Sequence, residues 1–133
     1  MSQNNFTILI VDNYHDDTTM LNDVLSNDYN LVHADNDKSA MDTALRCTPS
    51  LILVNFQSSD IKKSLGICNK LKNCSLTQGI PVISMVPSSN TLNDKENLEL
   101  GVVDCIVKPF NATELYSQIK INLLLRTPFN HFR

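Results

Sequence analysis

The sequence lacks several features that would place it in a specialised class of protein. No apolar run approaches the ~18 residues of a membrane-spanning helix. Residues 1–5 have neither the basic nor the apolar stretch of a signal peptide. A basic excess is also missing, because 11 Lys and Arg stand against 14 Asp and Glu. We therefore expect a cytoplasmic protein that contacts neither membranes nor nucleic acid directly.

The cysteines and histidines show no spacing typical of a metal or redox site. The four cysteines are separated by 21, 6 and 31 residues and form no C-x-x-C pair. The three histidines are scattered along the chain. We predict no metal site, and we expect the cysteines to be buried or half-buried free thiols: Cys47, Cys68, Cys74 and Cys105.

What the sequence does contain is enough apolar material for one domain. It has 133 residues, of which 42% are hydrophobic and 19% charged, as in ordinary globular proteins. Five short apolar runs recur, and four of them are nearly continuous, which is typical of parallel strands covered on both faces. The runs are Thr7–Val11, Leu31–Ala34, Leu51–Val54, Pro81–Val86 and Val102–Val107. The second run is the weakest, which suits an edge strand.

Helical patterns separate these runs. Each of them places apolar residues at helical spacing, and Asn111 is a candidate cap of the last one. Ser88–Asn90 is a candidate cap for the very polar fourth helix, and Gly101 is suited to end it. The predicted helices are Asp16–Ser26, Lys38–Arg46, about 62–73, about 92–100 and about 112–125.

Strict alternation of strands and helices predicts an α/β fold with right-handed crossovers. We predict a flavodoxin-like, doubly wound (βα)5 domain over residues 1–126, with a parallel five-stranded sheet of order 2-1-3-4-5. Residues 127–133 form a C-terminal tail or the stub of a linker. In such a fold the functional crevice lies beyond the carboxyl ends of the strands. The residues at those ends are Asp12 and Asn13, Asn55, Val86, and Lys108 with Pro109.

At this point the chain resembles the receiver domain of two-component response regulators over about residues 6–125. The resemblance rests on the segments Ile8–Asp12, Pro49–Val54, Ile80–Ile83, Gly101–Asp104 and Ile106–Phe110, in this order and at this spacing. It implies a phosphorylation switch. In receivers of this family, acids after the first strand hold Mg²⁺, and an Asp after the third strand takes a phosphoryl group from a histidine kinase. A Thr or Ser after the fourth strand and a Lys after the fifth bind the phosphoryl oxygens, and an aromatic residue on the fifth strand moves inward. The resemblance also implies a cis peptide bond before Pro109.

The sequence departs from that pattern at most of these points. Asn55 stands at the phosphoacceptor position and Asn13 at that of the second metal-binding acid. Val86 replaces the Thr or Ser, and Cys105 the switching aromatic residue. The loop after Asn55 lacks the usual Pro-Gly turn. The chain contains 16 Asn, so one Asp-to-Asn exchange alone would mean little, but correlated loss across the pocket indicates a degenerate site.

These changes alter the chemistry of the pocket. A neutral amide cannot attack phosphorus as a carboxylate does, so Asn55 is not a competent phosphoacceptor. Asp12 and Lys108 cancel in charge, so Mg²⁺ binding should be weak or absent. Asp16 and Asp17 suit the start of the first helix better than a metal site. We expect the ammonium group of Lys108 to bond to Asp12 and to the side-chain oxygen of Asn55.

The preferred hypothesis is a pseudo-receiver, which is a non-enzymatic, phosphorylation-independent domain that binds protein partners or a linked effector domain. It includes a homodimer through the face of the fourth helix, the fifth strand and the fifth helix. One alternative is phosphorylation at a non-standard residue such as Ser58 or Ser59. Another is a receiver-like sensor whose crevice binds a small molecule.

Overall fold

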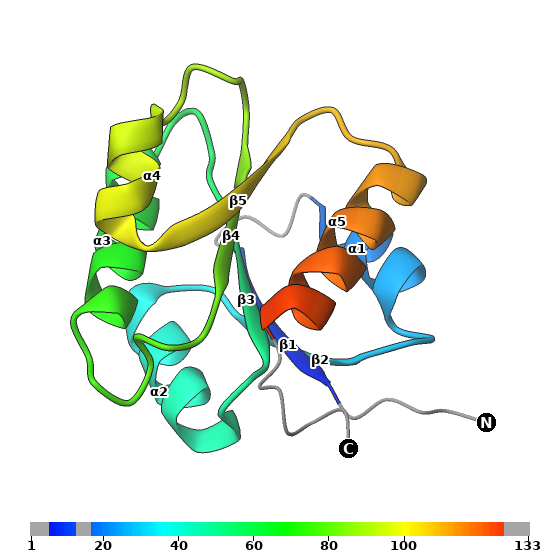
Figure 1. The fold of residues 1–133 in the computed structure, drawn as a ribbon, viewed down its shortest axis with the longest axis horizontal. Coiled ribbons are helices and arrows are strands. Elements are labelled where there is room, and N and C mark those ends of the chain that lie inside the picture. Colours follow the sequence, from blue (N-terminus) through cyan, green and yellow to red (C-terminus); the bar gives the residue numbers. More distant parts are fainter. Residues whose placement is uncertain (1–5, 13–16, 127–133) are drawn as a thin grey trace.

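The computed structural model describes residues 6–12 and 17–126. Five strands alternate with five helices and form one parallel sheet of order β2-β1-β3-β4-β5, which confirms the predicted fold (Figure 1). The strands are β1 (Thr7–Val11), β2 (Asn30–Ala34), β3 (Leu51–Asn55), β4 (Val82–Val86) and β5 (Val102–Val107). The helices are α1 (Thr18–Leu25), α2 (Asp37–Cys47), α3 (Ile61–Lys72), α4 (Asp94–Leu100) and α5 (Ala112–Arg126).

The sheet is covered on both faces, and its side chains alternate between two cores. Helices α1 and α5 lie on one side of the sheet and α2, α3 and α4 on the other (Figure 1). In β1, Ile8 and Ile10 join the cluster of the α1 and α5 side, whereas Leu9 and Val11 join the opposite cluster. All four are at most 1% exposed. A strand buried on both faces has a continuous apolar run in its sequence. This is why the apolar runs without alternation identified β1, β3 and β4.

The edges of the sheet follow the prediction with small shifts. β2 is an edge strand as expected, and it exposes the side chain of His33. β4 begins at Val82 and not at Pro81, because proline has no N–H group to donate to a strand neighbour. The carbonyl oxygen of Pro81 still accepts the N–H of Ile52 at 2.9 Å.

Three helices begin with reciprocal capping boxes. The pairs are Asn36 with Ser39 in α2, Asn93 with Glu96 in α4, and Asn111 with Glu114 in α5. The prediction for Asn111 is therefore confirmed, whereas that of a cap within Ser88–Asn90 is wrong. Asn93 caps α4 because Glu96 three residues later completes the box. Gly101 ends α4 in the left-handed conformation, as predicted.

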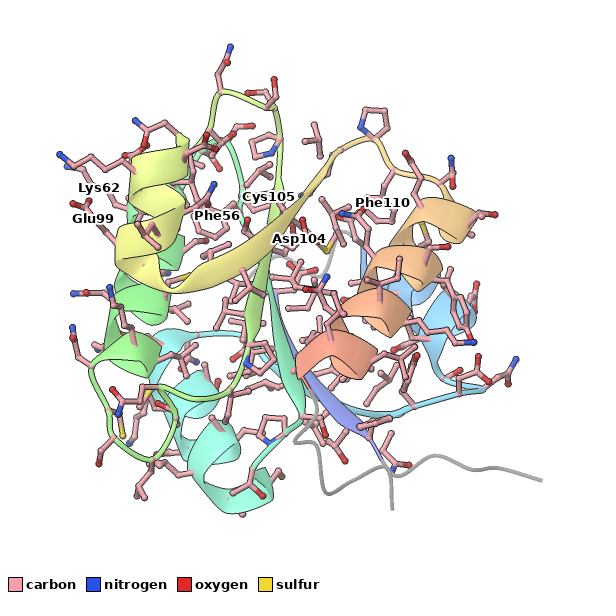
Figure 2. All side chains as sticks on the ribbon, in the orientation of Figure 1. Phe56, Lys62, Glu99, Asp104, Cys105 and Phe110 are labelled. Atoms are coloured by element: carbon pink, nitrogen blue, oxygen red, sulfur yellow. The ribbon has the colours of Figure 1, made fainter. Side chains whose placement is uncertain are left out.

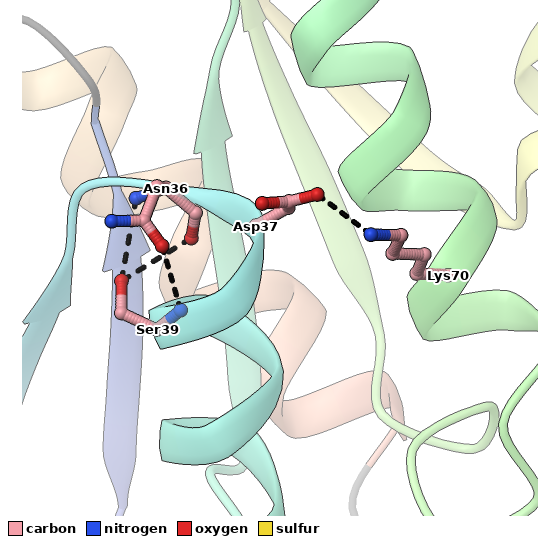
Figure 3. Close-up of polar contacts among 4 residues, drawn as sticks. All are labelled: Asn36, Asp37, Ser39 and Lys70. Atoms are coloured by element: carbon pink, nitrogen blue, oxygen red, sulfur yellow. Dashed lines mark hydrogen bonds and ion pairs between the residues drawn. The ribbon is translucent and has the colours of Figure 1, made fainter.

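The start of α2 also links that helix to α3. Asp37 forms an ion pair with Lys70 of α3 at 2.6 Å, beside the capping box of Asn36 and Ser39 (Figure 3). The hydrogen bond and charge of Lys70 hold the pKa of the Asp37 carboxyl below its ordinary value. Both side chains are about half exposed, so the pair orients the two helices more than it stabilises them.

The four cysteines are free thiols, and each is buried or half-buried, as predicted. Cys68 is fully buried in the core of the α2, α3 and α4 side. Burial, and to a smaller extent the charge of the nearby Cys105, raises the pKa of the Cys68 thiol to about 12.

Among the described residues, no helix is long and apolar enough to cross a membrane.

Two glycines give a matched test of this fold. Gly101 has φ of 74°, where an added Cβ costs roughly 1–2 kcal/mol. Gly66 lies in the middle of α3, and a Cβ there would meet nothing within 4 Å. We predict that Gly101→Ala lowers the free energy of unfolding by that amount, whereas Gly66→Ala raises it by roughly 0.5–1 kcal/mol. Urea unfolding followed by circular dichroism measures both free energies. If both variants changed the free energy of unfolding in the same direction, the backbone conformations described for the two glycines would be contradicted.

Candidate functional site

The polar residues predicted at the strand ends do meet at one edge of the sheet. Val11 pairs with Val54, so Asp12 and Asn55 follow on adjacent strands. Val86 pairs with Val107, which places Lys108 at the same edge. Here the structure has an open crevice of about 420 Å³. It is lined by Asp17, Met20, Gln57, Ser58, Pro87, Lys108, Pro109 and Phe110.

The centre of the crevice is a contact among Lys108, Asp17 and Asn55. The Nζ of Lys108 lies 3.3 Å from Oδ2 of Asp17. The amide Nδ2 of Asn55 donates to that same oxygen at 3.1 Å. Lys108 also donates to the main-chain oxygen of Phe56 at 3.5 Å. One carboxylate oxygen therefore accepts a hydrogen bond from Asn55, at the end of β3, and forms an ion pair with Lys108, which follows β5.

The predicted partners of Lys108 were wrong. Its carboxylate partner is Asp17 and not Asp12, and Asn55 contributes a donor and not an acceptor. Asp17 precedes α1, but its side chain makes no capping hydrogen bond, so the carboxylate is available to the crevice. Asn55 is 4% exposed, and its Oδ1 has no hydrogen-bond partner among the described residues. Asp12 is 1% exposed, and Asn13 lies outside the described residues.

The segments around the crevice are fixed by main-chain hydrogen bonds. The N–H of Lys108 donates to Val86 O at 2.9 Å, and that of Phe56 donates to Met85 O at 2.8 Å. The Lys108–Pro109 peptide bond is cis, as the family resemblance implied. Among the described residues, no three His, Cys, Asp or Glu side chains form a cluster that could hold a metal ion.

Comparison with known proteins now identifies the family. A family model described as the response regulator receiver domain matches residues 8–120. The chain belongs to this family. The receiver fold and its place in two-component signalling therefore hold for this chain.

Individual relatives agree with this assignment. The chain is 33% identical over 114 residues to Histidine kinase P4 of Formosa agariphila, covering 86% of this chain and 8% of that protein. It is 30% identical to the phosphate regulon transcriptional regulatory protein PhoB of Pseudomonas aeruginosa, covering 86% of this chain and 50% of that protein. The chain thus spans half or less of these curated relatives.

Solved structures show the same likeness. The receiver domain of a signal transduction histidine kinase from Syntrophus aciditrophicus has a TM-score of 0.75 at 26% identity, covering 93% of both chains. A putative response regulator from Chloroflexus aurantiacus has a TM-score of 0.78 at 23% identity, covering 90% of this chain and 98% of that one. The second likeness supports the fold alone.

Cys105, which the family resemblance places at the position of the switching aromatic residue, is part of a polar chain. Ser84 lies on β4 with its side chain fully buried, and its Oγ is 2.9 Å from the Sγ of Cys105 on β5. The Sγ of Cys105 in turn lies 3.4 Å from Oδ1 of Asn97 on α4. The Ser84 hydroxyl is therefore engaged beneath α4. Val86 is 2% exposed and packs with Phe56 in the core cluster.

A second polar network joins β5 to α5, and sequence reasoning missed it. Asn122 is 4% exposed and donates to Oδ2 of Asp104 at 2.9 Å. Gln118 donates to the main-chain oxygen of Cys105 at 3.2 Å. Asp104 and Cys105 lie on β5 between α4 and α5 (Figure 2). The available signal was Asn122 itself, a polar residue three positions after Ile119 on the buried stripe of α5.

The Asp17–Lys108 pair can be tested by a double-mutant cycle with Asp17→Asn and Lys108→Gln. The side chains are 27% and 19% exposed, so we predict a coupling free energy of about 1–2 kcal/mol, between exposed and buried pairs. Urea unfolding of the four proteins measures it.

The Lys63–Asp60 pair is the matched control, since it is longer at 3.9 Å and Lys63 is 52% exposed. Its coupling should stay below about 0.5 kcal/mol. A larger coupling of Lys108 to Asp12→Asn than to Asp17→Asn would contradict the observed pairing.

Proposed function

We propose that this receiver signals without phosphorylation at residue 55, as a pseudo-receiver that acts through protein contacts. The observation that carries the proposal is the hydrogen bond from the Asn55 amide to Asp17. An aspartate at this position would place a second carboxylate against Asp17 and would lose the hydrogen bond that the amide donates. The side chain at residue 55 is a neutral amide, whose oxygen is a much weaker nucleophile toward phosphorus than a carboxylate oxygen.

The same contacts disfavour the Mg²⁺ ion that receivers ordinarily use. Mg²⁺ prefers carboxylate and other hard oxygen ligands. Among the described residues, Asp12 and Asp17 against Lys108 give a net charge of −1, and Asp17 already accepts a hydrogen bond from Asn55 and forms an ion pair with Lys108. The residues of the crevice therefore fit a divalent cation poorly, and we propose that it binds weakly or not at all.

The face formed by α4, β5 and α5 is the proposed interaction surface. It exposes large apolar side chains from all three elements, with Leu98 at 78%, Val107 at 42% and Leu125 at 72% exposure. The bonds of Asn97, Gln118 and Asn122 to residues 104 and 105 hold both helices to β5. We propose that this fixed face binds a protein partner, a linked effector domain or a second copy of the chain.

The test is incubation with acetyl phosphate and Mg²⁺, followed by intact-mass analysis and sedimentation velocity. We predict no added phosphate and an unchanged sedimentation coefficient. The double variant Asn13→Asp with Asn55→Asp should bind Mg²⁺ measurably more tightly by calorimetry, because it restores two carboxylates. Phosphate on residue 55, or a dimer that requires acetyl phosphate, would refute the proposal. Phosphate on Ser58 or Ser59 would support the alternative of a non-standard phosphoacceptor.

A second candidate is that the crevice binds a small molecule. It is favoured by the open volume of about 420 Å³ beside Lys108, Gln57 and Ser58, since Val86 and Phe56 lie in the core and leave the crevice free. A thermal-shift screen of small carboxylates and phosphate esters tests it. The candidate predicts saturable stabilisation that Lys108→Gln abolishes, and stabilisation that survives this change would place the ligand elsewhere.

A further inference from the structure

A second groove lies away from the crevice, between α3 and α4. Leu65, Gly66 and Asn69 line it from α3, and Glu96, Glu99 and Leu100 from α4. Its volume of about 420 Å³ equals that of the crevice. Each helix contributes residues at helical spacing, so the groove follows the two helix axes. Leu65 and Leu100 are half-buried and pack against the core, which gives the groove apolar walls.

The groove is held open by contacts at its ends. Lys72, at the end of α3, donates to the main-chain oxygen of Glu99 near the end of α4. The stem of Lys72 lies against Gly101, which terminates α4. At the start of α4, the Oε1 of Glu96 accepts the N–H of Asn93 at 3.0 Å and so fixes that side chain. The two walls are therefore oriented before any partner binds.

Gly66 is the residue that the fold does not explain. A glycine inside a helix costs roughly 0.5–1 kcal/mol relative to alanine. Its φ lies outside the left-handed region, and an added Cβ would meet nothing within 4 Å. Neither backbone conformation nor internal packing requires glycine here. What glycine provides is a groove floor without a side chain, which lets another chain approach the backbone of α3 closely.

The charged side chains that line the groove indicate the kind of partner that it would bind. Glu96 and Glu99 line it, and neither carboxylate forms an ion pair within the described part of the chain. Lys62 lies one turn before Gly66 and Lys95 is next to Glu96, but neither lines the groove. Figure 2 shows Lys62 and Glu99 at the outer edge of the α3 and α4 pair. The lining thus combines apolar walls with two carboxylates that form no ion pair among the described residues.

We propose that the α3–α4 groove docks a basic amphipathic helix of a partner protein. An apolar side chain of that helix lies over Gly66 between Leu65 and Leu100, and its Lys or Arg residues face Glu96 and Glu99. This inference rests on the proposed function, because it assumes that the receiver acts through protein contacts. It adds a second binding surface, on the opposite side of α4 from the exposed Leu98.

The probe is a 14-residue amphipathic peptide of Leu and Lys, compared with a peptide in which each Lys is replaced by Glu. The full chain is titrated by ¹H–¹⁵N NMR without Mg²⁺ or acetyl phosphate. We expect the Leu/Lys peptide to shift amide signals of residues 65–69 and 96–100, and the Leu/Glu peptide to leave them unchanged. No shift with either peptide, or shifts centred on Leu98, Val107 and Leu125, would overturn the proposal.

Variants separate this groove from general attraction to an acidic protein. Gly66→Met fills the floor, and Glu96→Gln with Glu99→Gln removes the charge while retaining the capping oxygen of residue 96. Each should weaken binding about tenfold. The control Asp23→Asn with Asp42→Asn removes two exposed charges from α1 and α2 and should change affinity less than about twofold.

Spectral dispersion like that of the unaltered chain confirms that each variant is folded, and Gly66→Ala provides a second, smaller obstruction if Gly66→Met unfolds. Equal losses in the groove variants and the control would refute the proposal. Phosphorylation at residue 55 would refute the proposed function and leave the groove result standing, so the two failures are distinguishable.

Discussion

Burial of the sheet on both faces is the constraint from which the rest of this receiver follows. Every residue of β3 and β4 is buried, so neither strand can carry accessible polar chemistry along its length. Parallel strands also require crossover helices, and these cover the two faces. In the centre of the sheet, accessible polar groups are therefore confined to the ends of the strands, and others lie on the exposed edge strand β2 and on the outer helix surfaces. The crevice at the carboxyl edge and the groove between α3 and α4 are examples of the first and the last of these places.

At the carboxyl edge, the exchange of a carboxylate for an amide changes the direction of hydrogen bonding. Asn55 presents N–H groups to Asp17, and Lys108 presents another donor to the same carboxylate. This arrangement balances the half-buried ammonium without any ligand. An aspartate at residue 55 would instead compete with Asp17 for Lys108. The ammonium of Lys108 is thus paired within the protein itself, through Asp17.

The effect reaches α4 and α5 through β5. Cys105 is small, and its sulfur is held between Ser84 and Asn97, while its main-chain oxygen accepts from Gln118. A bulky aromatic residue that exchanges between two positions has no counterpart in this network. The buried Asn122 adds a further bond from α5 to Asp104. Together these contacts hold α4 and α5 to β5 and favour one arrangement of the α4–β5–α5 face.

The sequence by itself determined the architecture and the location of the site. Apolar runs and helical stripes are local patterns, and they sufficed for the elements and for the edge position of β2. Their alternation indicated the doubly wound fold, which gave the strand order and placed Asn55 and Lys108 at the same edge of the sheet, and Asn111 was recognisable as a capping residue. The prediction that Ser88–Asn90 caps the fourth helix failed, because the capping box of Asn93 and Glu96 begins α4 instead.

Only the tertiary structure decided which side chains pair. Asp17 and Asn55 are 38 residues apart, and the position of the start of α1 relative to β3 and β5 brings this carboxylate to Asn55 and Lys108. The bond of Asn122 to Asp104 and the open space before Gly66 likewise depend on how helices pack against strands. Periodicity reports which face of an element is buried, whereas a specific hydrogen bond requires the relative placement of two elements. That placement arises only when the sheet has assembled.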